Sequence, residues 1–303
     1  MKILICSDGS EAADRAIRLG AAIAAACQAE VTLLGIAEAS GNTEPIMDAL
    51  RRGQQWLLDK KISAELVTKV GQPIEEIVQR TEAVAYDLVV IGAAPKEPHG
   101  LFWRSSKTYK IIKSIHPAVL VVIGNVTTLK RILICTGGKK YIDNAVALTG
   151  QIARCMGATV TLFHVLPEAP AIYARIYSRE VNVAAVLNSK SELGRNLREQ
   201  KATLESFGVP TEVRLRQGSV RDEILREIRT GNYDLVVTGS SLSRGSLRTY
   251  VLGDVTREIV NRANCAVLVV RAMEKSDSAM SSLRSWLDRV ARRTVSSKSA
   301  EKK

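Results

Sequence analysis

The sequence lacks the features that define membrane proteins and secreted, disulfide-rich proteins. No apolar stretch approaches the roughly 20 residues that a membrane-spanning helix needs. The apolar strand pattern Ile3–Ile5 begins almost at Met1, without the charged leader, long apolar stretch and cleavage site that we expect of a secreted protein. The five cysteines are odd in number and are not spaced like a disulfide scaffold. We therefore expect a cytoplasmic protein in which Cys6, Cys135 and Cys265 are small buried hydrophobic residues.

Motifs of catalytic and metal sites are absent as well. The three histidines lie far apart and have no partners at metal-ligand spacing, so we expect no metal site. His164 ends a strand pattern and is expected to be a packed or hydrogen-bonded core residue. There is no Walker phosphate loop, no Gly-x-Ser-x-Gly turn and no Cys-x-x-Cys pair. The turn at Thr136–Lys139 resembles the phosphate loops of nucleotide alpha-hydrolases only weakly, because no Asp-Ser follows it. Nothing in the sequence requires an enzyme.

What the chain does contain is one pattern that occurs twice. Three segments of the first half recur in the same order in the second half, at offsets of 129, 147 and 148 residues. The pairs are Lys2–Cys6 with Arg131–Cys135, Tyr86–Gly92 with Tyr233–Gly239, and Ala118–Val122 with Ala266–Val270. Such ordered repetition predicts two copies of one domain. We assign residues 1–124 to the first domain, 125–130 to a linker, 131–272 to the second domain and 273–303 to a basic tail.

Each domain alternates short apolar strand patterns with helical patterns. Because the strand patterns are apolar on both faces, they predict an α/β fold whose parallel sheet is covered by helices on both sides. The second domain has 18 additional residues between Val165 and Gln217, which we expect to lengthen one helix over about 172–206. Sheets of this kind bind ligands beyond the carboxyl ends of their strands, where the strand order reverses. The expected strands are 3–7, 31–36, 64–70, 88–91 and 119–123 in the first domain, and 132–135, 159–165, 211–216, 235–238 and 267–270 in the second.

Charge is distributed unevenly along the chain. The net charge is zero over residues 1–124, +8 over 125–271 and +4 from 272 onward, which together give the +12 of the whole chain. A protein that binds nucleic acid throughout its length would be basic in both domains, so we expect no nucleic acid partner. An acidic partner would bind to the second domain or the tail.

The tail contains a pattern typical of a short amphipathic helix. Apolar residues recur at helical spacing between arginines, so a basic helix is expected within residues 280–294. This helix either packs on its own domain, or contacts a partner protein or a membrane surface, or the segment is disordered. The apolar positions are Leu283, Trp286, Leu287, Val290 and Ala291, and the arginines are Arg284, Arg289, Arg292 and Arg293.

The ordered motifs of residues 1–123 and 130–271 resemble the universal stress protein family. The segments that carry the resemblance are Ile3–Ser10, Val31–Ile36, Gly71–Ile77, Tyr86–Gly92 and His116–Val122, several of which have counterparts in the second domain. The resemblance implies two tandem five-stranded parallel-sheet domains of Rossmann-like type that form a pseudo-dimer. It also implies a cytoplasmic protein that responds to stress rather than a metabolic catalyst.

Many members of that family bind ATP through a pattern G-x2-G-x9-G-S/T and an aspartate that ends the first strand. Glycines let phosphate approach the backbone, and the following helix N-terminus supplies free N–H groups. In the first domain the resemblance assigns this role to Asp8, Gly9, Ile36, Gly92, Ser105 and Ser106, but Pro95 stands where the second glycine belongs. The basic residues Lys96, Arg104, Lys107 and Lys110, together with His99, offer charge for an anion. Two interpretations stay open: a serine that only caps the helix over 106–115, or a cap that also binds ATP, AMP or another anion.

The second domain departs further from the pattern. Gly137 replaces the aspartate, and the interval from Gly239 to Gly253 is one residue too long, with Ser243 near the place of the second glycine. Asp254 takes the hydroxyl position, where it is expected to cap the helix over 254–263 and to repel a triphosphate. We therefore expect Gly239 and Gly253 to be remnants of a lost site.

Together these observations favour a non-enzymatic regulator of the stress response that binds nucleotide in the first domain at most. A ligand-free adaptor, which presents its surfaces to an unidentified protein partner, is the alternative, and a weak ATPase ranks behind both. The sequence leaves open whether two chains associate as a homodimer, and it does not name the stress.

Overall fold

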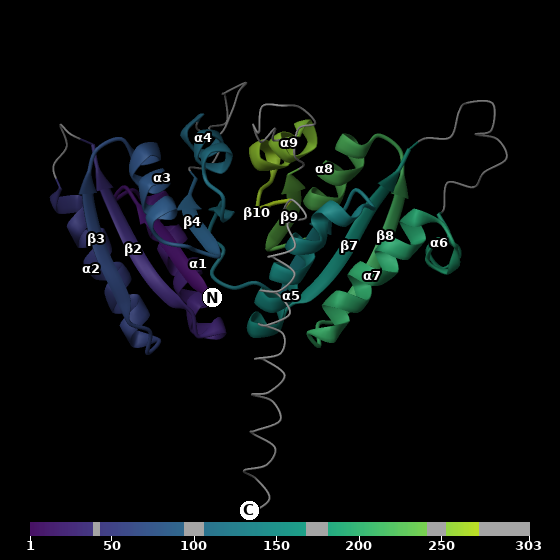
Figure 1. Cartoon of the computed structure of the whole chain (residues 1–303), viewed down its shortest axis with the longest axis horizontal. Helices are drawn as coiled ribbons and strands as arrows, with labels where there is room; N and C mark the ends of the chain where they lie inside the picture. The colour runs from purple at the N-terminus through teal and green to yellow at the C-terminus, as the bar shows by residue number, and fades with distance from the viewer. Residues whose placement is uncertain (39–42, 94–105, 168–180, 241–252, 273–303) are drawn as a thin grey trace, which may run out of the picture. The chain divides into compact units, whose positions relative to one another are not determined.

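The computed structural model describes residues 1–38, 43–93, 106–167, 181–240 and 253–272, which belong to one compact unit, Met1–Ala272 (Figure 1). The amphipathic helix expected within residues 280–294 lies outside the described residues. In the first domain the elements are β1 (Lys2–Ser7), α1 (Glu11–Cys27), β2 (Glu30–Ala37), α2 (Glu44–Asp59), β3 (Ala64–Val70), α3 (Pro73–Ala83), β4 (Leu88–Gly92), α4 (Ser106–Ser114) and β5 (Ala118–Val122).

The second domain repeats this order with a longer connection after its second strand. Its elements are β6 (Arg131–Cys135), the 3-10 turn η1 (Lys140–Ile142), α5 (Asp143–Met156), β7 (Thr159–Leu166), α6 (Val183–Asn188), α7 (Glu192–Ser206), β8 (Thr211–Gln217), α8 (Val220–Thr230), β9 (Leu235–Ser240), α9 (Asp254–Arg262) and β10 (Ala266–Arg271). Every strand expected from the sequence is present, with ends that differ by at most two residues.

The additional residues of the second domain do not form the single helix expected over about 172–206. Residues 168–180 lie outside the described part of the chain, and the remainder forms the separate helices α6 and α7. The break has a local cause, because Ser191 is extended and its hydroxyl accepts a hydrogen bond from the Gly194 N–H at 3.0 Å. The prediction was wrong because it assigned the additional residues to one helix and did not recognise Ser191 as the N-cap of a second helix.

The strands of the described residues join one sheet in the order β3-β2-β1-β4-β5-β10-β9-β6-β7-β8. Neighbouring strands within each domain are parallel, which confirms the parallel, Rossmann-like fold expected for each domain. The two domains meet at β5 and β10, which pair antiparallel with Leu120 opposite Leu268. This antiparallel pairing was not predicted from the sequence.

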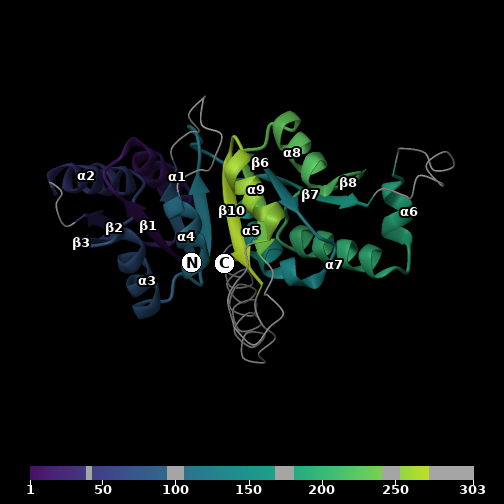
Figure 2. The same cartoon turned by 90° about the horizontal axis from the view of Figure 1, so that it is seen from above.

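Helices cover both faces of the sheet in each domain (Figure 2). Successive strand residues point to opposite faces, so Ile3 and Ile5 pack beneath α1 and α2 while Leu4 and Cys6 pack with α3 and α4. In the second domain α5 and α7 belong to the first of these layers, and α8 and α9 belong to the other. Cys6, Cys135 and Cys265 are buried, as expected. Among the described residues, none of the helices combines the length and the apolarity that crossing a bilayer requires.

Contacts on both faces of the sheet reinforce the β5–β10 pairing. On one face α1 packs against α5, with Cα atoms of the two helices closer than 8 Å. On the other face the Arg271 guanidinium donates to the Ile112 and Lys113 carbonyls, at 2.9 and 2.6 Å. These carbonyls lie in the last turn of α4, where a cation also meets the negative end of the helix dipole. The second domain therefore holds the end of a helix that belongs to the first.

A polar network ties each outer strand to the helix that follows it. In the first domain Glu65 of β3 pairs with Arg80 of α3 at 2.5 Å, and Arg80 also donates to the Tyr86 hydroxyl at 2.8 Å. The Tyr86 hydroxyl in turn donates to Thr32 at 3.1 Å. The helix thus supplies the cation and the strand supplies the carboxylate.

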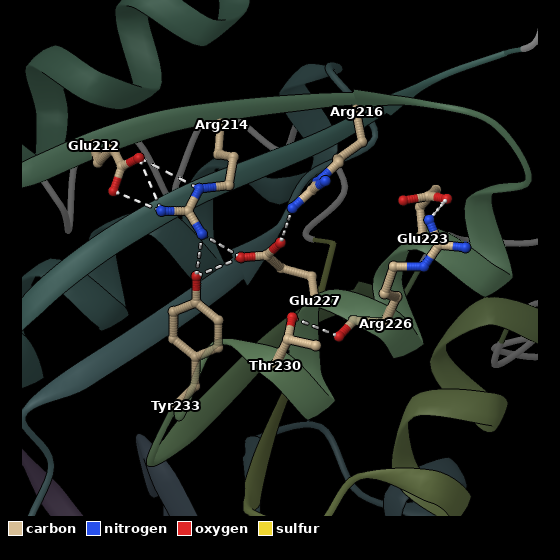
Figure 3. A network of polar contacts seen from close by, with 8 residues as sticks. All are labelled: Glu212, Arg214, Arg216, Glu223, Arg226, Glu227, Thr230 and Tyr233. Carbon is tan, nitrogen blue, oxygen red and sulfur yellow. Dashed lines mark hydrogen bonds and ion pairs between the residues drawn. The ribbon is translucent and has the colours of Figure 1, made fainter. Parts of the chain in front are cut away.

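The second domain contains the same network with its charges exchanged (Figure 3). Glu227 of α8 has a side chain only 1 % exposed, and it pairs with both Arg214 and Arg216 of β8. The Tyr233 hydroxyl donates a further hydrogen bond to Glu227 at 2.8 Å. Burial alone would raise the pKa of Glu227, but the hydroxyl and the two guanidinium groups outweigh burial and hold the pKa below its ordinary value.

Candidate functional site

The candidate ligand site of each domain lies where the strand order reverses. In the first domain β1 lies between β2 and β4, so the chain leaves β1 toward one side and later returns on the other. The turn after β1, the end of β2 and the end of β4 therefore meet at one edge of the sheet, near the start of α4. In the second domain β6 lies between β7 and β9 in the same way.

The turn after β1 presents Asp8 to solvent. The Ser7 hydroxyl accepts from the Gly9 N–H at 3.2 Å, and Gly9 has a φ of +79°, a conformation that favours glycine. The Asp8 carboxylate accepts from the Ser10 N–H at 3.0 Å, and Ser10 then caps α1 through the Ala13 N–H. Asp8 is thus held in place by the backbone while its side chain stays exposed.

Lys107, in the first turn of α4, pairs with Glu38 just beyond β2. Its ammonium nitrogen lies 2.7 Å from the Glu38 carboxylate, and both side chains are more than half exposed. The hydrogen bond and charge of Glu38, with a smaller contribution from Asp8, raise the pKa of Lys107. The lysine that was expected to attract an anion therefore already has a carboxylate partner, which an incoming anion must replace.

Gly92 has a packing role that does not depend on a ligand. A methyl group at Gly92 would lie 2.1 Å from the Ala12 carbonyl oxygen of α1, which is far too close. At the corresponding Gly239 of β9, a methyl group would lie no closer than 3.5 Å to the Ile142 side chain. The two glycines therefore occupy equivalent places in the sequence pattern but have different surroundings.

The remaining residues predicted for the first site are only partly placed. Ile36 is buried in β2, in the core layer that contains Leu4 and Cys6. Ser106 begins α4, whereas Ser105 lies outside the described residues. The other predicted loop residues, Pro95, Lys96, His99, Arg104 and Ser243, lie outside them as well.

In the second domain the turn after β6 has the same backbone but different neighbours. The Thr136 hydroxyl accepts from the Gly138 N–H at 3.0 Å, and Gly138 has a φ of +69°, as at Ser7 and Gly9. A methyl group at Gly137 would lie 2.1 Å from the Tyr141 hydroxyl oxygen, so the tyrosine occupies the space that a side chain would need. Burial raises the pKa of Tyr141.

Two polar side chains of α7 also form hydrogen bonds with this turn. Asn196 donates to the Gly138 carbonyl at 2.9 Å, and Gln200 donates to the Lys139 carbonyl at 3.2 Å. The Gln200 side-chain oxygen also accepts from the Thr136 hydroxyl at 3.1 Å. Asn196 and Gln200 are each only 2 % exposed, so the inner side of the turn is held by protein groups, whereas Gly137 and Lys139 stay exposed.

His164 of β7 belongs to the same cluster. Its Nδ1 lies 2.8 Å from the Thr136 carbonyl oxygen, and burial lowers its pKa despite this hydrogen bond. The interpretation of His164 as a hydrogen-bonded residue is confirmed. Tyr141, Asn196 and Gln200 were missed in the sequence, although Asn196 and Gln200 share a helix face with Leu193, Leu197 and Leu204, a signal that could have revealed them.

The start of α9 differs slightly from the expectation. Gly253 is the N-cap residue and Asp254 is the first helical residue, so Asp254 was wrongly expected to be the cap. The Asp254 side chain is exposed and its charge still suits the positive end of the helix dipole. The Thr256 hydroxyl donates to the Gly239 carbonyl at 3.0 Å and ties this helix directly to the end of β9.

The repeated fold matches a known protein family. The family model described as "Universal stress protein family" matches residues 1–122 and again residues 128–271. The chain belongs to the universal stress protein family. Both the resemblance inferred from the motifs and the tandem arrangement are therefore confirmed.

Individual universal stress proteins match one half of the chain or nearly all of it. One from Methanocaldococcus jannaschii is 27 % identical over 146 residues, which covers 48 % of this chain and 84 % of the relative. One from Methanothermobacter thermautotrophicus is 24 % identical over 144 residues, which covers 48 % of this chain and 97 % of the relative. The crystal structure of a universal stress protein from Archaeoglobus fulgidus matches with a TM-score of 0.69 and 16 % identity, over 90 % of this chain and 98 % of that one. The similarity in fold to this solved structure therefore covers nearly all of both chains.

Proposed function

We propose that the chain is a non-enzymatic regulator of the stress response in which only the first domain binds ATP, AMP or another anion. The observation that carries this proposal is the difference between the two turns. Asp8 is exposed at the edge where the strand order reverses, whereas the matching position in the second domain is Gly137, next to the Tyr141 hydroxyl. One domain thus has an exposed carboxylate where the other has a glycine without a side chain to bind a ribose.

The first site has chemically suitable groups for a nucleotide. A carboxylate accepts hydrogen bonds, so Asp8 suits the hydroxyl groups of a ribose. The first turn of α4 brings backbone N–H groups and the positive end of a helix dipole, which suit a phosphate. Lys107 adds a cation once it exchanges Glu38 for the phosphate. An anion must therefore compete with the exposed Lys107–Glu38 ion pair, and such a pair contributes about 0–1 kcal/mol.

Two observations favour the ligand-free adaptor as the second candidate. The close packing of Gly92 against Ala12 explains why a glycine is needed there and does not require a phosphate. Lys107 is already paired with Glu38, so its charge has a structural use. If these roles are the only ones, the fold serves to present surfaces to a protein partner.

Calorimetric titration of the full-length protein with ATP, AMP and cyclic AMP distinguishes the two candidates. We expect Asp8→Ala to abolish nucleotide binding, because it removes the ribose acceptor. Asp254→Ala is the matched control in the second domain and should leave the affinity unchanged. Glu38→Gln should tighten binding by up to about fivefold, because it frees Lys107 from its ion pair.

Other outcomes would overturn parts of this proposal. If no nucleotide produces heat or a thermal shift, the ligand site is absent and the adaptor remains. If Asp8→Ala leaves the affinity unchanged while Asp254→Ala alters it, the assignment of the two domains is reversed.

A further inference from the structure

Each domain contributes one cysteine near the contact between α1 and α5. Cys27 is the last residue of α1, and Cys155 is the penultimate residue of α5. Although they lie far apart in sequence and in different domains, their thiols contact each other through a hydrogen bond. Both residues are half-buried, so small molecules can reach them. They differ in this respect from Cys6, Cys135 and Cys265, which are buried.

The contact makes one thiol acidic. The hydrogen bond from Cys27 lowers the pKa of Cys155 although burial opposes it, and the charge of Arg154 adds to the lowering. The same hydrogen bond, together with burial, raises the pKa of Cys27. By contrast, burial raises the pKa of Cys6 to about 12. Since the thiolate is the reactive form of cysteine, Cys155 is the more reactive member of the pair.

We propose that hydroperoxides oxidise Cys27 and Cys155, and that the two residues then form a disulfide that links the two domains. In the first step, written for hydrogen peroxide, the Cys155 thiolate attacks a peroxide oxygen, the O–O bond breaks, and the departing hydroxide takes up a proton from solvent to leave as water. Cys155 then carries a sulfenic acid. In the second step the Cys27 sulfur attacks the Cys155 sulfur, the S–O bond breaks, and the hydroxyl group leaves with the Cys27 proton as a second water. The two thiols lose two electrons in total, which the peroxide accepts.

The disulfide would change how the domains are joined. In the reduced protein they are held by the β5–β10 pairing and by side-chain contacts, all of which can separate reversibly. A covalent link between Cys27 and Cys155 closes a loop that contains most of the first domain and the start of the second. Disulfides that close long loops stabilise the folded state, and thiol reductants reverse them.

The test uses the full-length, reduced protein treated with hydrogen peroxide. Maleimide tagging and mass spectrometry should show that two of the five thiols disappear within each chain and return with dithiothreitol. Peptide mapping should find Cys27 linked to Cys155. The oxidised protein should also melt about 5–10 °C higher than the reduced protein.

Variants separate the proposed roles. Cys27→Ser should stop the reaction at a sulfenic acid on Cys155, which dimedone traps, and Cys155→Ser should slow thiol loss at least tenfold. Cys6→Ala, which removes a buried thiol, should still form the disulfide. The proposal is overturned if the lost thiols map to Cys6, Cys135 or Cys265, if the link forms between chains, or if both thiols of the pair survive peroxide.

Discussion

Replacing Gly92 by alanine tests whether packing or ligand binding explains this glycine. The added methyl group would lie 2.1 Å from the Ala12 carbonyl oxygen and 2.7 Å from the Ala13 nitrogen. These are backbone atoms of α1, so the clash cannot be relieved by rotating a side chain. Overpacking of this kind costs about 1–3 kcal/mol, whereas the lower entropy of the unfolded chain returns about 0.4–1 kcal/mol. Because the clash is with two backbone atoms, we expect the net loss for Gly92→Ala to lie toward the upper end of this difference, at about 2 kcal/mol of the free energy of unfolding.

Gly239→Ala is the matched control, since Gly239 occupies the equivalent position in the second domain. Its methyl group would make ordinary contacts with Ile142 at 3.5 Å, so the variant should be as stable as the wild type or slightly more stable. Thermal unfolding without nucleotide should separate the two variants by about 4–8 °C. Hydrogen exchange should place the loss in β1, β4 and α1.

The reasoning would be refuted if both variants melted together with the wild type. A Gly92→Ala protein that is fully stable but no longer binds nucleotide would show instead that the glycine faces a ligand. Such a result would also strengthen the proposed site in the first domain.

Two further predictions concern the polar contacts. Glu227→Gln should lower the free energy of unfolding by about 1–3 kcal/mol at pH 7, because Arg214 and Arg216 lose their shared partner. Since folding lowers the pKa of Glu227, its contribution is present above the pKa of the unfolded chain, about 4.3, and declines as the pH falls below it. Thermal unfolding from pH 7 to pH 3 should show the gap to wild type closing, and a constant gap would contradict this account. Arg271→Gln should cost about 1–2 kcal/mol and increase hydrogen exchange in α4, whereas Arg51→Gln, which breaks an exposed pair with Asp48, should change stability by less than about 0.5 kcal/mol. Equal effects of the two arginine variants would argue against the role of Arg271 at the end of α4.

The strands and their order in the chain could be predicted because their signal is local. Segments such as Ile3–Ser7 and Leu88–Ile91 are apolar at every position, which suits a parallel sheet covered on both faces. The antiparallel pairing of β5 with β10 could not be predicted in this way. Val119–Val121 resembles any other buried strand in sequence, and its partner is selected by tertiary packing alone.

The candidate site could be predicted only where the turn chemistry is local. The sequence Asp8-Gly9-Ser10 indicated a turn that opens a helix, and the structure shows such a turn. The side-chain hydrogen bonds to the second turn come from Asn196 and Gln200, which lie about 60 residues away in the chain. Their placement depends on how α7 packs, and no pattern near Gly137 encodes it. For the same reason the pairing of Lys107 with Glu38 was not foreseen.

The joining of two domains in one chain, through the pairing of β5 with β10, also affects how their sequences can evolve. In a symmetric assembly of identical chains, one codon specifies the same residue at both sites, so both sites change together. Here each domain has its own codons, and a substitution at Gly137 or Tyr141 leaves Asp8 unaltered. One half of the chain can therefore be selected for binding a ligand while the other is selected for stability or for a partner. Because the sheet is continuous across both domains, the two halves can accumulate different substitutions and still form one folded unit.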